Sequence, residues 1–348
     1  MKPLPTDDLT DIVQRVHDWS RFRNARIFMT GGTGFFGTWM LSALLAADNQ
    51  LGLNLKIAVL SRCPENFEQH HPHIACANNL QFVQGDITSF DFPAGSYDYI
   101  FHFAATSAEA TFNGEDQLKK LEMLYFGTKR VLDFAVAASV KKILFTSSGV
   151  VYGQMDDELE GVGEGFRGSP DVSRPDAALG EGKRIAEYLF AYYHEKYKIS
   201  YGIARCFSFI GPHLPLDIHY AAGNFVKNCL DGKDIIISGN GQPIRSYLYI
   251  GDATSWLIKI LTATDQKSIY NVGSSRSITI EELAVVIKKI LKTNNKIIIN
   301  NKHKTLDNFS RNLYLPKLSL IKDKLSVIEW TSLEKSIEKM AKFYSKIN

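Results

Sequence analysis

The sequence lacks most of the features that mark secreted, membrane-spanning or zinc-binding proteins. It has four cysteines in 348 residues, and none of them has the Cys-x-x-Cys spacing, so we expect neither a disulfide framework nor a zinc or other metal site. No apolar run reaches the roughly 18 residues of a transmembrane helix. The first residues contain prolines and aspartates without an apolar core, which does not fit a secretory signal. These absences favour a protein of the reducing cytoplasm with no membrane partner.

The sequence also lacks a strong excess of charge of either sign. Forty basic and 37 acidic residues leave a formal net charge of +3, which is too small to predict a nucleic-acid partner. Apolar residues make up 45% and charged residues 22%, the balance of a folded globular protein. The histidines of residues 70–73 are interpreted as part of a solvated loop rather than a metal site. The Lys- and Asn-rich residues 287–304 are interpreted as an exposed helix and strand rather than a polyanion site.

An alternation of apolar strands and amphipathic helices fills the first two thirds of the chain. We expect helices at 7–24, 35–47, 117–140 and 181–196, and strands at 25–30, 55–60, 80–86, 97–103, 142–148 and 201–205. This order predicts an α/β fold, a Rossmann-type doubly wound parallel sheet with right-handed crossovers. Residues 154–176 predict a surface loop. The mixed pattern beyond residue 211 predicts a smaller C-terminal α/β lobe.

A glycine-rich turn at residues 30–37 (TGGTGFFG) connects the first expected strand to the helix that follows. Gly31, Gly34 and Gly37 suit a backbone that approaches a pyrophosphate without Cβ atoms and directs a helix N-terminus at it. The strand–turn–helix context favours this over an ordinary tight turn, and the lack of Gly-Lys-Ser/Thr excludes a Walker A loop. We therefore expect an N-terminal helical extension at 1–24, a mainly NAD(P)-binding domain at 25–210, and a mainly substrate-binding lobe at 211–348 that partly returns to the sheet.

The ends of the second and third expected strands concern the choice of coenzyme. The second strand ends at Arg62 without the Asp or Glu that usually binds the ribose of NAD. Because a guanidinium suits a 2′-phosphate, NADP(H) is favoured, with NAD(H) as the alternative; Arg62 is otherwise a solvated loop residue. At the end of the third strand, Asp86 either bonds the adenine amino group, with Ile87 packed on the ring, or caps a turn. At the end of the fourth, small residues let the backbone pass close to the coenzyme, and His102 is interpreted as a core histidine.

These segments, in this order, resemble the extended short-chain dehydrogenase/reductase superfamily, and within it the NAD-dependent epimerase/dehydratase family that acts on nucleotide sugars. The resemblance covers about residues 25–340 and rests on residues 30–37, 85–87 (GDI), 102–105 (HFAA), 147–153 (SSGVVYG), 180–187 (GEGKRIAE), 205–212 (RCFSFIGP) and 245–252 (RSYLYIGD). It implies that the coenzyme is bound by Gly31, Gly34, Phe35, Phe36, Gly37, Arg62, Asp86, Ile87, Phe103, Ala104, Ala105, Lys183 and Phe207.

The resemblance implies hydride transfer at a sugar carbon, with Ser148 and Lys183 as catalytic residues. Ser148 would hold the sugar oxygen, while Lys183 would bind the nicotinamide ribose and lower the pKa of a tyrosine that exchanges the proton. That tyrosine belongs four residues before Lys183, where this sequence has Leu179. A leucine side chain cannot transfer a proton.

Three explanations of Leu179 stay open. The chain is an altered form of an active enzyme, or it binds a nucleotide sugar without converting it. The third explanation is that another group supplies the proton, the candidates being Glu181, Cys206, Tyr220 and a relayed water.

The resemblance also implies that a nucleoside-diphosphate sugar is the partner. Asn224, Arg245 and Arg311 fall where family members hold the pyrophosphate and the base, and arginine suits phosphate because its charge is permanent and its fork is bidentate. Ser208 stands where the family often has asparagine. The substrate-binding residues implied are Thr106, Ser148, Ser208, Asn224, Phe225, Arg245 and Arg311.

The favoured reaction is the NADPH-dependent reduction of a 4-keto-6-deoxy nucleoside-diphosphate sugar, in deoxysugar and surface-polysaccharide biosynthesis. Residues 148–150 lack the two carboxylates that family 4,6-dehydratases use, which disfavours dehydration by that route. The alternatives are a nucleotide-sugar epimerase or 4,6-dehydratase of the same family, and a catalytically silent nucleotide-sugar-binding protein. The helices expected at 117–140 and 181–196 are the candidates for pairing two chains into a homodimer, as the family often does.

Overall fold

The computed structural model describes residues 1–105, 113–155, 160–218, 220–300 and 312–345. By their contacts, the residues divide into two compact units. The first unit comprises Met1–Val151, Asp171–Arg205 and Thr254–Tyr270, and the second comprises Tyr152–Pro170, Cys206–Ala253 and Asn271–Asn348. The second unit thus includes residues 152–170, which lie well before the boundary expected near residue 210.

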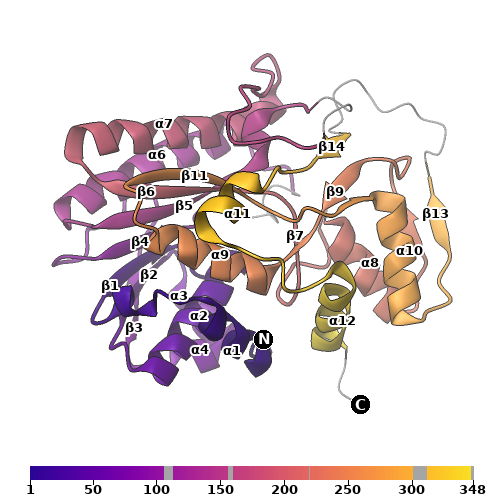
Figure 1. The fold of residues 1–348 in the computed structure, drawn as a ribbon, viewed down its shortest axis with the longest axis horizontal. Coiled ribbons are helices and arrows are strands. Elements are labelled where there is room, and N and C mark those ends of the chain that lie inside the picture. Colours follow the sequence, from indigo (N-terminus) through magenta and orange to yellow (C-terminus); the bar gives the residue numbers. More distant parts are fainter. Residues whose placement is uncertain (106–112, 156–159, 219, 301–311, 346–348) are drawn as a thin grey trace. The chain divides into compact units, whose positions relative to one another are not determined.

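The first unit is built on a seven-stranded sheet (Figure 1). Its strands, in spatial order, are β11 (Lys267–Val272), β6 (Ser200–Cys206), β5 (Lys142–Ser148), β4 (Tyr99–His102), β1 (Arg26–Thr30), β2 (Lys56–Ser61) and β3 (Leu80–Gln84). The pairs β1–β2, β2–β3, β1–β4 and β4–β5 are parallel. The order of strands changes direction between β1 and β4, as in a doubly wound sheet, and this confirms the predicted fold class.

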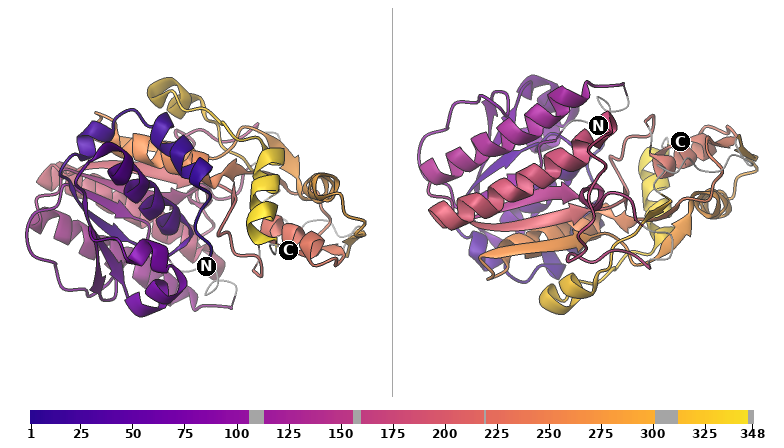
Figure 2. Two further views of the ribbon diagram at one scale, coloured as in Figure 1. Left: turned by 90° about the horizontal axis from the view of Figure 1, so that it is seen from below. Right: turned by 90° about the horizontal axis from the view of Figure 1, so that it is seen from above.

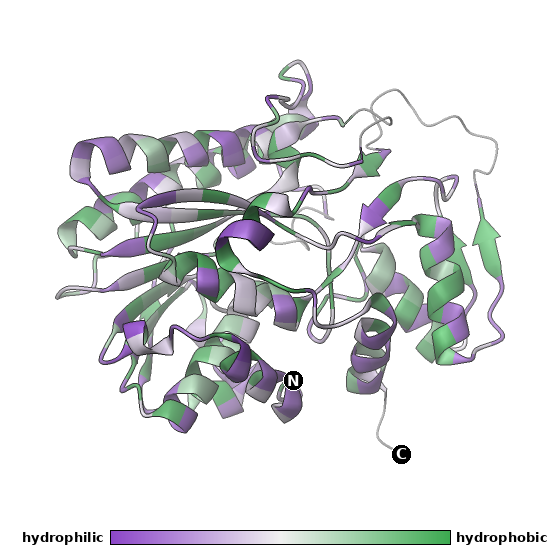
Figure 3. Ribbon diagram, viewed as in Figure 1, coloured by the Kyte–Doolittle hydropathy of each residue, from purple (hydrophilic) through white to green (hydrophobic). Residues whose placement is uncertain are grey.

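Long helices cover both faces of this sheet. Helices α6 (Gln117–Ala137) and α7 (Ala178–Tyr197) lie side by side on one face, and α2 (Phe35–Leu51) and α9 (Ile250–Thr262) lie on the other (Figures 1 and 2). The strands are predominantly hydrophobic, whereas α6 and α7 alternate hydrophobic and hydrophilic segments (Figure 3). Buried side chains from the strands and from these two helices form one core, including Phe28, Ile143, Phe145, Phe134 and Phe190.

The remaining helices of the first unit are short. They are α1 (Thr6–Arg15), α3 (Pro64–His70), α4 (Pro72–Ala75) and the 3₁₀ turns Trp19–Phe22, Gly149–Tyr152 and Pro175–Ala177. The helix expected over residues 7–24 is therefore interrupted, because the backbone is extended at Val16. The loop expected at residues 70–73 was wrong, because His70 and His73 lie in α3 and α4, although both side chains are exposed as expected. His71 is buried between two short helices and stacks on Phe67 with ring centroids 4.5 Å apart.

The described residues of the second unit form four helices and three small sheets. The helices are α8 (Ala221–Leu230), α10 (Ile280–Leu291), α11 (Ser319–Leu325) and α12 (Leu333–Tyr344). The sheets pair β7 (Phe209–Ile210) with β10 (Leu248–Tyr249), β8 (Ile235–Ile237) with β13 (Ile297–Ile299), and β9 (Ile244–Ser246) with β12 (Ser277–Thr279) and β14 (Leu313–Tyr314). Thr279 and Glu282 form a capping box that fixes the start of α10. None of the described helices is both long and apolar enough to span a bilayer.

Candidate functional site

Two glycines of the turn after β1 are required by the packing of the protein itself. Gly31 has φ +67°, and a Cβ there would lie 2.6 Å from the main-chain nitrogen of Ala104. A Cβ at Gly37 would lie 2.3 Å from the main-chain oxygen of Gly31. Because Gly31 has no side chain, the turn can contact the residues that follow β4. Because Gly37 has none, the first turn of α2 can pack against the glycine-rich turn.

Gly34 differs from Gly31 and Gly37 because no contact among the described residues requires a glycine there. It is the N-cap of α2, with φ −90°, and a Cβ would meet one atom, the oxygen of Gly31, at an ordinary 3.5 Å. The main-chain groups at the start of α2 are thus left approachable from outside. This is the geometry that a pyrophosphate needs at a helix N-terminus, so the residues present fit a dinucleotide coenzyme.

His102 belongs to a buried polar network beneath the turn. Its Nδ1 lies 2.8 Å from Thr30 Oγ1 and its Nε2 lies 3.2 Å from Thr128 Oγ1, while Ala104 N donates to Thr30 Oγ1 at 3.3 Å. Burial, with a smaller contribution from the charge of Lys183, lowers the pKa of His102 to about 3. The interpretation of His102 as a core histidine is confirmed by its burial and by the partners of both ring nitrogens, and the network links the ends of β1 and β4.

The neighbouring strands β2 and β3 bring Arg62 and Asp86 together. Arg62 is exposed, directly after β2. Asp86 Oδ1 accepts hydrogen bonds from Thr88 N at 2.9 Å and Thr88 Oγ1 at 2.6 Å. Burial opposes ionisation of Asp86, but these bonds and the charge of Arg62 outweigh it, so the pKa is lowered. One carboxylate oxygen of Asp86 therefore caps a turn. The side chain of Ile87 packs against α6 at Gly127, where a Cβ would lie 3.0 Å from Ile87 Cγ1.

Lys183 reaches from α7 to the end of β5. Its Nζ donates a hydrogen bond of 2.6 Å to the main-chain oxygen of Thr146 and lies 4.5 Å from the ring centroid of Phe145. The side chain is buried. Two residues beyond Thr146, Ser148 is half-buried and its Oγ accepts from Val150 N at 3.3 Å. Of the two residues expected to be catalytic, Ser148 is the last residue of β5, and Lys183 is hydrogen-bonded to the same strand two residues earlier, at Thr146.

The position expected to carry the proton lies inside α7. The helix begins at Ala178 rather than near residue 181, so Leu179 is already helical. It lies one turn before Lys183 and on the same face. Leu179 is half-buried and offers no ionisable group at this place.

Sequence reasoning did not assign a role to a group one turn further along the helix. Glu187 Oε1 accepts from Ser147 Oγ at 2.6 Å and from Arg205 Nε at 3.1 Å, and Oε2 accepts from Arg205 Nη2 at 2.6 Å. Glu187 comes from α7, Ser147 from β5 and Arg205 from β6. The spacing of four residues from Lys183 was the pattern that could have identified Glu187.

The remaining expected coenzyme residues of the first unit lie around the turn. Phe35 and Phe36 open α2, with ring centroids 5.7 Å apart, and Phe36 lies 6.3 Å from Phe103. Phe103 is buried, Ala104 is half-buried and Ala105 is exposed. These residues follow β1 and β4, the two strands between which the sheet order changes direction.

In the second unit, the expected residues are partly gathered around one aromatic cluster. Phe207 packs against Tyr314 with ring centroids 4.7 Å apart and the rings tilted by 40°. The guanidinium of Arg245 lies 5.9 Å from the centroid of the Tyr314 ring. Arg245 Nη1 donates to the main-chain oxygens of Ile244 at 2.8 Å and Asn312 at 3.3 Å. Burial, with a smaller contribution from Tyr314, raises the pKa of Tyr220.

The other expected substrate residues have mainly internal contacts. Asn224 Nδ2 donates to the main-chain oxygen of Ile218, and Phe225 is buried in α8. Ser208 is half-buried, and its main-chain oxygen accepts from Leu248 N at 3.0 Å. Thr106 and Arg311 lie outside the described residues.

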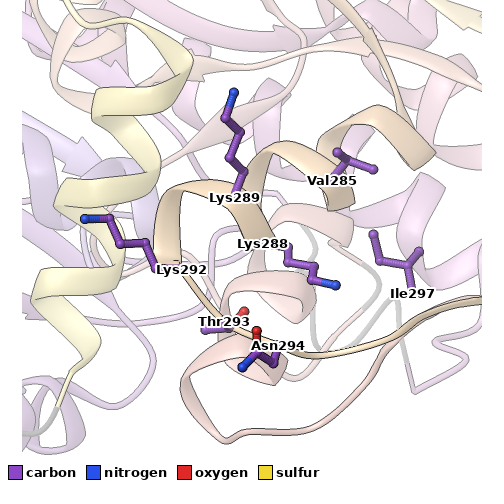
Figure 4. Close-up of a pocket in the computed structure, with 7 residues that line it drawn as sticks. All are labelled: Val285, Lys288, Lys289, Lys292, Thr293, Asn294 and Ile297. Atoms are coloured by element: carbon purple, nitrogen blue, oxygen red, sulfur yellow. The ribbon is translucent and has the colours of Figure 1, made fainter.

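A hollow elsewhere in the second unit contains none of the expected site residues. It lies along the last turns of α10 and is lined by Val285, Lys288, Lys289, Lys292, Thr293, Asn294 and Ile297. The three ammonium groups point in different directions (Figure 4), and lysines in the last turn of a helix stabilise its dipole. This supports the interpretation of the region as an exposed helix and strand.

Comparison with known proteins agrees with this arrangement. The model of the NAD dependent epimerase/dehydratase family matches residues 27–273. The UDP-glucuronic acid decarboxylase 6 of Arabidopsis thaliana is 27% identical over 269 residues, covering 77% of this chain and 75% of that protein. The dTDP-D-glucose 4,6-dehydratase of Mus musculus is 26% identical over 283 residues, covering 78% and 74%.

Solved structures share the fold. The UDP-N-acetylglucosamine 4-epimerase of Methanobrevibacter ruminantium M1 superposes with a TM-score of 0.78 at 21% identity, covering 92% of this chain and 98% of that one. The UDP-glucuronic acid 4-epimerase of Bacillus cereus, in complex with UDP-glucuronic acid and NAD, gives 0.77 at 21% identity, covering 91% and 98%. By the family model, which spans more than half of its residues, this chain belongs to the NAD-dependent epimerase/dehydratase family.

Proposed function

We propose that the protein binds a nicotinamide coenzyme on the turn of residues 31–37 and acts on a nucleoside-diphosphate sugar. The observation that carries the proposal is the contrast within the turn. Gly31 and Gly37 serve internal packing, whereas Gly34 leaves the start of α2 approachable although the protein itself would tolerate a Cβ there. A glycine at such a place is explained by a ligand that needs the space.

The coenzyme proposed is NADP(H), with NAD(H) as the alternative. Arg62 supports NADP(H), because an exposed guanidinium at the end of β2 can bind a 2′-phosphate in bidentate fashion. Two facts support NAD(H). The first is that the charge of Arg62 is partly balanced by the Asp86 carboxylate, whose pKa it helps to lower. The second is that the structurally similar 4-epimerase of Bacillus cereus is described as a complex with NAD.

The coenzyme supplies the hydride, and the residues of this chain bind and orient the reactants. Lys183 Nζ is fixed at the end of β5 by its hydrogen bond to the main-chain oxygen of Thr146, and it would bind the nicotinamide ribose. Ser148, at the end of the same strand, would hold the sugar oxygen. Asn224, Phe225, Ser208, Arg245 and Phe207 of the second unit would contribute to holding the nucleotide sugar and the coenzyme. Leu179 carries no proton, so the proton at the sugar oxygen must come from another group.

The reaction proposed is reduction of a 4-keto-6-deoxy nucleoside-diphosphate sugar in the cytoplasm. Sugar epimerisation and 4,6-dehydration are alternatives, supported by the structural likeness to 4-epimerases and by the murine relative described as a 4,6-dehydratase. Decarboxylation of a nucleotide-linked uronic acid is a further alternative, supported by the Arabidopsis relative. A silent binding protein is supported by Leu179.

Turnover with defined sugars separates these functions. The protein is incubated with NADPH or NADH and a 4-keto-6-deoxy UDP- or dTDP-sugar, and both the coenzyme absorbance and the mass of the sugar are followed. The reductase reaction predicts coenzyme oxidation with a matching gain of two hydrogens in the sugar. An unchanged coenzyme would contradict it. Conversion of UDP-glucose or UDP-glucuronic acid with bound NAD would identify an epimerase or a decarboxylase instead.

We also propose that the protein forms a homodimer through α6 and α7. Their outer surfaces expose large apolar side chains, among them Leu118 (62% exposed), Phe126 (51%) and Tyr188 (65%). Exposed apolar side chains gathered on neighbouring helices are typical of a surface that another protein covers.

A further inference from the structure

The carboxylate of Glu187 connects α7 to two adjacent strands of the sheet. It accepts three hydrogen bonds, two from the Arg205 guanidinium and one from Ser147 Oγ, at 2.6 to 3.1 Å. Only 9% of the Glu187 side chain and 13% of the Arg205 side chain are exposed. A buried carboxylate is costly unless its partners are held in good geometry. All three hydrogen bonds of the Glu187 carboxylate therefore form only when α7 has one particular rotation about its axis and one particular position along β5 and β6.

That constraint acts on the same face of α7 that carries Lys183. Residues 183 and 187 are four apart, which is about one turn and about 6 Å along the axis. Their partners, Thr146 and Ser147, are consecutive in β5. A shift of α7 that broke the bonds of Glu187 would also move the Lys183 ammonium away from the Thr146 oxygen and from the end of β5 at Ser148.

A second carboxylate offers a matched comparison. Asp133 of α6 accepts a hydrogen bond from Tyr193 Oη of α7 and pairs with Lys129 at 2.8 Å. This contact also attaches α7 to its surroundings, but Tyr193 lies ten residues beyond Lys183, or about 15 Å along the helix. It joins α7 to α6 rather than to the sheet. Loss of this contact should loosen the helix without acting directly on Lys183.

We propose that Glu187 is a positioning residue for Lys183. It holds α7 in the register in which the Lys183 ammonium meets Thr146 and is presented, together with Ser148, to coenzyme and sugar. The inference rests on the proposed function, because the position of Lys183 matters through coenzyme binding. Arg205 and Ser147 are its partners, and Glu187 need not touch either ligand.

The first test uses the protein without ligand. The rate of acetylation of Lys183 by acetic anhydride is measured across a range of pH by mass spectrometry of its peptide. Glu187→Gln is expected to raise this rate about tenfold, because a shifted α7 would take Lys183 Nζ out of its buried hydrogen bond with Thr146 and expose it to the reagent. Asp133→Asn should leave it within about twofold of the unaltered protein, since its contact lies far from Lys183. An unchanged Lys183 rate in Glu187→Gln, or an equal rise in both variants, would overturn the proposal.

The second test measures the dissociation constant of NADPH and NADH by calorimetry. Glu187→Gln is expected to weaken binding about tenfold, and Asp133→Asn by less than about twofold, in proteins shown by urea titration to be folded. If Glu187→Gln does not fold, Ser147→Ala removes one of the three bonds and should act in the same direction with a smaller effect. Unaltered protein that binds neither coenzyme would contradict the proposed function, while the acetylation result would still decide whether Glu187 positions Lys183.

Discussion

Leu179 and Lys183 lie one turn apart on the same face of α7, and Lys183 Nζ donates a hydrogen bond to the main-chain oxygen of Thr146. We propose that position 179 is where a proton-exchanging tyrosine would act together with Lys183. Introducing the missing phenol by Leu179→Tyr should raise the rate of hydride transfer to a 4-keto nucleotide sugar by about 10²–10⁴-fold, the usual effect of a positioned acid or base. The rate is measured as oxidation of the reduced coenzyme.

Leu179→Phe is the control for this substitution, because it adds the ring without the hydroxyl. It should leave the rate at the level of the unaltered chain. Equal rates in the tyrosine and phenylalanine variants would show that position 179 does not limit the reaction.

The glycines of the turn predict two different defects. Gly37→Ala should destabilise the fold, because its Cβ would lie 2.3 Å from the Gly31 oxygen, which the backbone must move to relieve. Gly34→Ala should leave the thermal midpoint nearly unchanged and weaken coenzyme binding about tenfold or more, because the methyl group would occupy the approach of the pyrophosphate. Calorimetry and thermal unfolding of both variants test this. Coenzyme affinity that survives in Gly34→Ala would be evidence against this binding site.

Arg62 should determine the preference between the two coenzymes. Arg62→Ala is expected to weaken NADPH binding by about 1.5–3 kcal/mol, the contribution of a hydrogen bond to a charged group, with little change for NADH. The two dissociation constants are measured side by side in the variant and in the unaltered protein. A parallel loss of affinity for both coenzymes, or no loss, would argue that Arg62 is a solvated loop residue.

His102 makes stability depend on pH. Its pKa is lowered from 6.5 to about 3 in the folded protein, so between these values the unfolded chain binds a proton that the folded protein does not. The free energy of unfolding should therefore fall on acidification through this window, with a contribution from His102 of about 1.4 kcal/mol per pH unit. Urea unfolding measured at several pH values should give a shallower slope for His102→Asn. Identical slopes in the two proteins would contradict a neutral, buried His102.

The proposed homodimer predicts that a charge on the outer face of α7 separates the chains. Tyr188→Glu should convert the dimer to a monomer in analytical ultracentrifugation, because the carboxylate would have to be buried in an apolar interface. Tyr188 is 65% exposed within one chain, so the fold should tolerate the change. Lys198→Glu, at the end of the same helix and also exposed, is the control and should remain a dimer. A monomeric unaltered protein would refute the dimer.

Local sequence patterns were sufficient to predict six of the seven strands of the large sheet, while β11 lies in the region expected to form the C-terminal lobe. Apolar runs such as residues 25–30 and 142–148 are buried strands because parallel strands covered on both faces need apolar side chains throughout. The glycines at 31, 34 and 37 marked the turn by their spacing between a strand and a helix, but only the structure shows that a side chain is excluded at Gly31 and Gly37 and not at Gly34. The starts and ends of helices were less certain, and α7 begins three residues earlier than expected, which is enough to place Leu179 inside it.

Contacts between distant residues were beyond sequence reasoning. Glu187 and Arg205 meet only because α7 packs on β6, and Phe207 and Tyr314 are more than a hundred residues apart in the chain. Asp86 could bond adenine or cap a turn, and its bonds to Thr88 became known only with the local backbone. The burial of His71 was missed because its Pro-containing surroundings resemble a loop and instead form two short helices.

Isothermal titration of the unaltered protein with NADPH, NADP, NADH and NAD tests the central claim most directly. The turn after β1 predicts saturable binding of at least one nicotinamide coenzyme at one site per chain, with the affinity reduced in Gly34→Ala. The absence of binding by all four, in protein that unfolds cooperatively, would contradict the account.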